Sequence, residues 1–72
     1  MDTNSRAFVE GYAHGALYGV ATARQAVGLL ERAGLPAFND QIDAFRCGSE
    51  DGARADMFRL SLIKSRAGGW PS

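Results

Sequence analysis

The first part of the chain carries apolar residues at helical spacing and contains no proline before residue 36. Its apolar positions, separated by alternating steps of four and three, are Val9, Ala13, Ala16, Val20, Ala23, Val27 and Leu30. This period places them on one side of an α-helix, so we expect residues 5–33 to form one long helix. Thr3, Asn4 and Ser5 each offer a side-chain oxygen that can cap its first turn.

The end of this predicted helix is specified by residues 30–36. Gly34 suits the left-handed conformation that follows many helices, and the proline two residues later cannot continue a helix. Leu35 can fold back onto Leu30, as in a Schellman motif. We therefore expect the helix to end at Ala33.

A second helical pattern extends over residues 39–67, and either Asn39 or Asp40 can cap it. Within this pattern, residues 47–52 contain two glycines, a serine and two acidic residues. Each glycine inside a helix costs about 1 kcal/mol relative to alanine. We therefore expect this arm to be kinked or broken at 47–52, with one continuous helix as the alternative. Residues 68–72 are expected to form a flexible tail.

No alternating run of β-branched and aromatic residues predicts a strand. The sequence thus predicts an all-α helical hairpin that forms a single small domain over residues 1–72. Its core is thin, because 12 of the 33 apolar residues are alanine. The single cysteine, Cys47, excludes a disulfide within the chain and is interpreted as a buried or half-buried small apolar residue. We expect homodimerisation to complete this small fold.

A row of small residues spaced four apart lies along one face of the first predicted helix. Its members are Ala7, Gly11, Gly15, Gly19 and Ala23. Its three glycines together cost a helix about 2–3 kcal/mol relative to alanine, but they let another backbone approach closely. We interpret this row as a helix-packing or dimer groove, filled by the second arm, a second copy or a target protein. A straight partner helix follows such a row only briefly, which favours two contacts, one within the chain and one across a homodimer.

A neighbouring row with the same spacing is polar and is interpreted as a solvated face; it consists of Arg6, Glu10, His14, Tyr18 and Thr22. His14 has no carboxylate or thiol companions at metal-ligand spacing. The sequence also contains no phosphate-binding glycine loop, metal-binding helix motif or calcium loop. We therefore expect no enzymatic activity, no cofactor and no metal.

Aromatic and arginine side chains supply the candidate partner interface, because these residue types dominate binding energy at protein surfaces. They are Tyr12, Tyr18, Phe38, Phe45, Arg54, Phe58 and Arg59. Arg54, Arg59 and Lys64 are five apart and spiral around a helix, and the formal net charge is zero. Nucleic-acid binding is therefore not expected.

The longest uncharged stretch, residues 11–23, is 13 residues long, whereas roughly 20 are needed to cross a bilayer. The polar beginning of the sequence does not resemble a secretory signal, so we expect a cytoplasmic protein with no membrane span. The function expected from these features is a small cofactor-free interaction module that inhibits or modulates a larger protein by occluding its surface. Such chains are typical of antagonists encoded by phages or mobile elements. The alternatives are a small DNA-binding transcriptional regulator and a structural subunit of a larger assembly.

Overall fold

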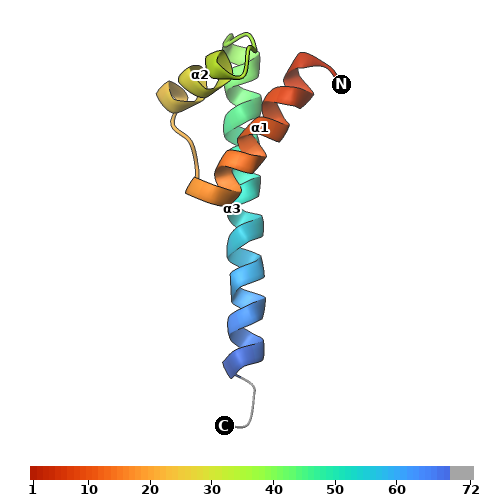
Figure 1. The fold of residues 1–72 in the computed structure, drawn as a ribbon, viewed down its shortest axis with the longest axis vertical. Coiled ribbons are helices and arrows are strands. Elements are labelled where there is room, and N and C mark those ends of the chain that lie inside the picture. Colours follow the sequence, from red (N-terminus) through yellow and green to blue (C-terminus); the bar gives the residue numbers. More distant parts are fainter. Residues whose placement is uncertain (69–72) are drawn as a thin grey trace.

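The computed structural model describes the backbone of residues 1–68 and the side chains of residues 1–55, and this part of the chain is all-helical. Helix α1 spans Thr3–Tyr18, α2 spans Ala23–Arg32 and α3 spans Asn39–Gly68. Helices α1 and α2 lie beside the first half of α3, while its second half projects beyond them (Figure 1). The predicted all-α class is confirmed for the described residues.

The single helix expected over residues 5–33 is wrong, because the chain leaves the helix at Gly19. The φ angle of Gly19 is 93°, in the left-handed region that glycine adopts without steric cost. The Thr22 hydroxyl then accepts a hydrogen bond from the N–H of Gln25 at 3.1 Å, and Gln25 Oε1 accepts one from the N–H of Thr22 at 3.0 Å. This reciprocal capping box starts α2 as a separate helix.

The expected end of this helical segment at Ala33 is confirmed. Ala33 is the C-cap of α2, and Gly34 follows it with a φ of 73°. The N–H of Leu35 donates to the carbonyl of Leu30 at 2.9 Å, and the N–H of Gly34 donates to the carbonyl of Glu31 at 3.0 Å. These two bonds are those of a Schellman motif, and they reverse the chain toward α3.

Helix α1 is capped by Asp2 and not by Thr3, Asn4 or Ser5. The Asp2 Oδ1 accepts a hydrogen bond from the N–H of Ser5 at 2.7 Å. This backbone hydrogen bond lowers the pKa of the Asp2 carboxyl, because it stabilises the charged form. The cap is one residue earlier than expected because the helix already includes Thr3.

The residues expected to cap the second arm, Asn39 and Asp40, lie inside α3. The preceding residue, Phe38, instead donates its N–H to Gln41 Oε1 at 3.2 Å. The Nε2 of Gln41 donates to Asn4 Oδ1 at 2.7 Å. One glutamine side chain thus fixes the beginning of α3 and ties it to the beginning of α1.

Helix α3 is continuous through residues 47–52, so the kink or break expected there is wrong. Gly48 and Gly52 both lie against the backbone of α1. A Cβ atom on Gly48 would fall closer than 3.0 Å to the carbonyl oxygen of Phe8, and one on Gly52 would do the same at Tyr12. Close packing against α1 therefore offsets the poor helix propensity of these glycines.

The glycines of α1 make the reciprocal approach to α3. A Cβ atom on Gly11 would fall closer than 3.0 Å to the backbone of Phe45, and one on Gly15 would overlap the backbone of Ser49. Gly11 meets Phe45, and Gly15, one turn later, meets Ser49. The residue numbers of both helices therefore rise in the same direction, so α1 and α3 run parallel where they touch. Helix α2 lies to one side of this contact and carries the chain from the end of α1 back to the start of α3 (Figure 1).

Alanine makes up half of the buried apolar core. Its members are Ala7, Ala21, Ala26, Leu30, Leu35 and Phe45. Phe45 and Leu30 are the largest fully buried side chains in this part of the chain. The thin core expected from the alanine content is therefore completed by backbone contact between helices.

Ser49 links the turn after α1 to α3. Its Oγ accepts a hydrogen bond from the N–H of Ala21 at 3.0 Å and donates to the carbonyl of Arg46 at 2.7 Å. Both Ser49 and Ala21 are almost completely buried. The hydroxyl therefore satisfies a backbone N–H that water does not reach.

Cys47 is exposed, which corrects the expectation that it is buried. The burial expected from its apolar character is not realised because the neighbouring Gly48 faces α1 in its place. Gly68 is the last residue of α3, and the rest of the predicted flexible tail, residues 69–72, lies outside the described residues. Within the described part, no helix is both long and apolar enough to cross a bilayer.

The surroundings of two helical glycines predict that replacement by alanine has opposite effects on the free energy of unfolding at the two positions. Gly15→Ala should destabilise the fold by about 1–3 kcal/mol, because the new methyl group forces the backbones apart. Gly28→Ala should stabilise it by about 0.5–1 kcal/mol, because nothing lies within 4 Å of a Cβ at that exposed position. Urea unfolding followed by circular dichroism measures both changes. Equal effects of the two substitutions would contradict the close contact.

A second prediction concerns the buried hydroxyl. Ser49→Ala should cost about 1–3 kcal/mol, because the N–H of Ala21 would stay buried without an acceptor. Hydrogen exchange measured by NMR should show that protection at Ala21 falls more than at the amides of α2. Unchanged protection at Ala21 would contradict the proposed role of the hydroxyl.

Candidate binding site

The structure places the five members of the small-residue row in different environments. Ala7, Gly11 and Gly15 are buried on α1. Gly19 is the C-cap of α1, and Ala23 is an exposed first residue of α2. The break between the helices therefore separates the last two members from the packing face.

The candidate interface residues do not form one surface. Phe45 is only 1% exposed, so it belongs to the core and is not available to a partner. Tyr12 and Tyr18 are exposed on α1, Phe38 is exposed before α3, and Arg54 is exposed on α3. The remaining candidates, Phe58 and Arg59, have side chains outside the described part of the structure.

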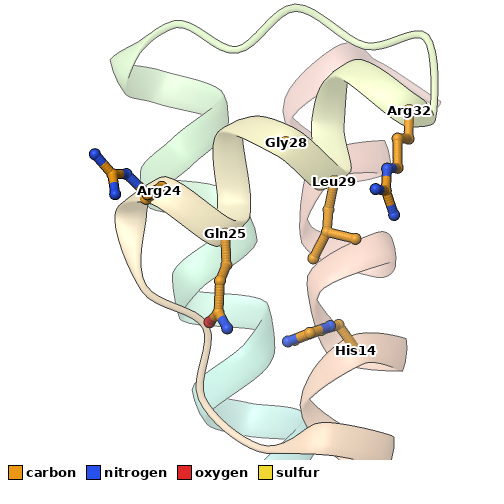
Figure 2. Close-up of a pocket in the computed structure, with 6 residues that line it drawn as sticks. All are labelled: His14, Arg24, Gln25, Gly28, Leu29 and Arg32. Carbon is orange, nitrogen blue, oxygen red and sulfur yellow. The ribbon is translucent and has the colours of Figure 1, made fainter.

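A cleft opens between α1 and α2, where these helices are not in close contact (Figure 2). Its volume is about 310 Å³. Its lining residues are His14, Arg24, Gln25, Gly28, Leu29 and Arg32. Because Gly28 has no side chain, it leaves one wall of the cleft open.

The cleft continues into two adjoining hollows that share His14, Leu29 and Arg32. Toward the end of α1, these hollows reach Tyr18 and other apolar residues. Among these apolar residues, Leu17 is 75% exposed and Val20 is 55% exposed. The concave site therefore joins a region of exposed apolar surface.

His14 forms the floor of the cleft and is held by two aromatic rings. Its ring centroid lies 5.2 Å from that of Tyr18 and 5.8 Å from that of Phe45. Phe45 belongs to α3, so a phenylalanine of the core packs against the imidazole ring. In Figure 2 the imidazole points toward the side chain of Gln25.

The capping box of α2 also orients Gln25 in the cleft. Because Gln25 Oε1 accepts the N–H of Thr22, the amide group cannot turn freely. Figure 2 shows the amide nitrogen on the side that faces His14. The residue that starts α2 thus presents a hydrogen-bond donor to the cleft.

The charged groups around the cleft are mainly cationic. Figure 2 shows Arg32 extending from α2 toward the cleft and Arg24 pointing outward from its opposite edge. The side-chain hydrogen bonds found among the described residues involve neither guanidinium group. Glu10, on the α1 side of the adjoining hollow, is the one carboxylate among the lining residues.

The outer face of α1 is unusual because the helix buries its smallest residues and exposes its larger apolar ones. Ala7 is 0% exposed, whereas Val9 is 50% exposed and Leu17 is 75% exposed. Tyr12 is 41% exposed beside the ring of Phe8, with the two ring centroids 6.5 Å apart. Of the apolar stripe expected from the sequence, Val9 and Ala13 on α1 are thus exposed and Ala16 is half-buried, whereas its last member, Leu30, lies in the core.

The chemistry available at the cleft is binding through hydrogen bonds and apolar contact. Within the described residues, no group of three or more His, Cys, Asp or Glu side chains is placed to hold a metal ion. The cleft residues Gln25, Leu29 and Arg32 were not among the predicted site residues, because one long helix leaves no cleft beside His14. The signal that could have found them is the Thr22-x-x-Gln25 spacing of a capping box.

Comparison with protein-family models found no matching family, and comparisons with curated proteins and with solved structures found no match.

Proposed function

We propose that the protein is a small cofactor-free interaction module that binds a larger protein through the outer face of α1 and modulates it by covering part of its surface. One observation carries this proposal, which is the exposure of the large apolar residues of α1. Scattered single apolar residues are common on protein surfaces, but an apolar helix face is typical of an interaction site.

The distribution of charge along α1 supports this choice of surface. Arg6 and Glu10 are the only residues of α1 that carry a formal charge, and both lie in its first half. The second half exposes Tyr12, Ala13 and Leu17. Covering Ala13 and Leu17 removes apolar area from water, and Glu10, which lines the same hollow, is the one carboxylate beside this surface.

A homodimer is a second candidate, and it would use the same face. Gly11 and Gly15 already contact α3 of their own chain, so the glycine row does not supply the dimer interface. An antiparallel contact of two α1 helices centred on Ala13 would set Val9 opposite Leu17 of a second copy. Small residues at the centre and larger ones beside it would make this face self-complementary.

The proposal predicts that Leu17→Gln weakens partner binding by about tenfold or more while leaving the fold intact, because this side chain is 75% exposed. Phe38→Gln is the matched control, since Phe38 is 74% exposed but lies outside α1. Affinity capture from a lysate of the source organism, followed by titration of the captured protein, measures the effect. Equal affinity of both variants and the original chain would contradict the use of α1.

Light scattering on a sizing column separates the two candidates. A monomeric mass leaves the outer face of α1 free for a different protein. A dimeric mass that becomes monomeric in Leu17→Gln, but not in Phe38→Gln, would replace the partner proposal with the homodimer.

A further inference from the structure

We propose that the cleft between α1 and α2 binds an acidic side chain of a partner protein, flanked by apolar residues, in an extended or helical segment. This inference rests on the proposed function and adds the chemical class of the segment that is recognised. It is carried by the polar groups that surround the cleft and by the apolar surface that continues from it.

The first step is the hydrogen-bonding capacity of the cleft. The Gln25 carbonyl oxygen is occupied by the capping bond to Thr22, so this side chain offers its amino group to the cleft (Figure 2). Arg32 contributes a guanidinium group, which carries only donors. A site rich in donors is complementary to an acceptor with several lone pairs, and a carboxylate has two oxygens for this purpose.

The second step is charge. Arg32 extends toward the cleft and Arg24 stands at its opposite edge, pointing outward, whereas the one carboxylate, Glu10, does not line the cleft itself but only the adjoining hollow, which Arg32 also lines. An arginine can bind a carboxylate through two parallel hydrogen bonds. The excess of positive charge therefore favours an acidic ligand and disfavours the second half of α3 of another copy, which carries Arg54, Arg59, Lys64 and Arg66.

The third step is the apolar surface, which distinguishes a peptide from a free anion. Leu29 lines the cleft beside Arg32, and the adjoining hollows reach Leu17 and Val20. Both hollows are open to solvent, so a peptide segment can reach their lining residues. Apolar residues on either side of the acidic residue would contact this surface.

The test titrates the ¹⁵N-labelled 72-residue chain with a capped Leu-Glu-Leu peptide and with the matching Leu-Gln-Leu peptide, and follows amide shifts by NMR. The expected result is saturable shifts at His14, Gln25 and Leu29 with the glutamate peptide, and an affinity for the glutamine peptide that is about tenfold lower. Equal affinities, or no shift in the cleft with either peptide, would overturn the proposal. A third titration uses sodium propionate, a carboxylate without flanking apolar residues. Propionate binding as tight as that of the glutamate peptide would also overturn the proposal.

Two variants connect the binding to the named groups. Gln25→Glu keeps an acceptor for the Thr22 N–H, so α2 should still form, but it places a negative charge in the cleft. We expect it to lose binding of the glutamate peptide by about tenfold or more, as should Arg32→Gln. Arg46→Gln, at an exposed arginine on α3 that does not line the cleft or the adjoining hollows, is the control that should bind normally. Normal binding by Gln25→Glu and Arg32→Gln would overturn the assignment.

The peptide titration and the capture experiment can contradict their two proposals independently. A loss of charge selectivity in the peptide titration would remove the acidic segment but leave the capture result at Leu17 standing. A failure of capture with intact peptide selectivity would instead count against the interaction module.

Discussion

Where α1 crosses α3, glycines on both helices let the two backbones meet without side chains between them. Gly11 and Gly15 admit the backbone of α3, and Gly48 and Gly52 admit the backbone of α1. Close helix approach of this kind gains dispersion contacts and Cα–H···O contacts along its length. Because the helices are so close, a core of six buried residues, half of them alanine, is sufficient to fill the space beside them.

The same contact decides what lies on the surface. Glycine and alanine occupy the face of α1 that contacts α3, so the larger apolar residues of α1 lie on its other faces. Val9 and Leu17 therefore face outward on α1, and the cleft beside α2 has an apolar wall that runs into Leu17. The proposed binding surfaces thus follow from the choice of small residues at the helix crossing.

The features that could be predicted from the sequence are those set by neighbouring residues. The Schellman motif at Gly34 depends on a few adjacent positions, and its predicted location is confirmed. The capping box at Thr22 is equally local, but the long apolar period through the break favoured one helix over two. The continuity of α3 was not predictable in this way, because Gly48 looks like a helix breaker until the backbone of α1 is placed against it. The cleft escaped prediction for the same reason, since it exists only once α2 has separated from α1.

The path of the chain also has a consequence for the order in which the molecule assembles. The α2–α3 turn is closed by hydrogen bonds between near neighbours, whereas the bond from Gln41 to Asn4 joins residues 37 positions apart. Closing the longer loop costs more chain entropy, so we expect α1 to dock last and to detach first. A ligand that binds the cleft between α1 and α2 would then stabilise the whole fold by mass action, because residues of both helices line the cleft and it is complete only after docking. In this molecule, recognition and the completion of folding would share one equilibrium.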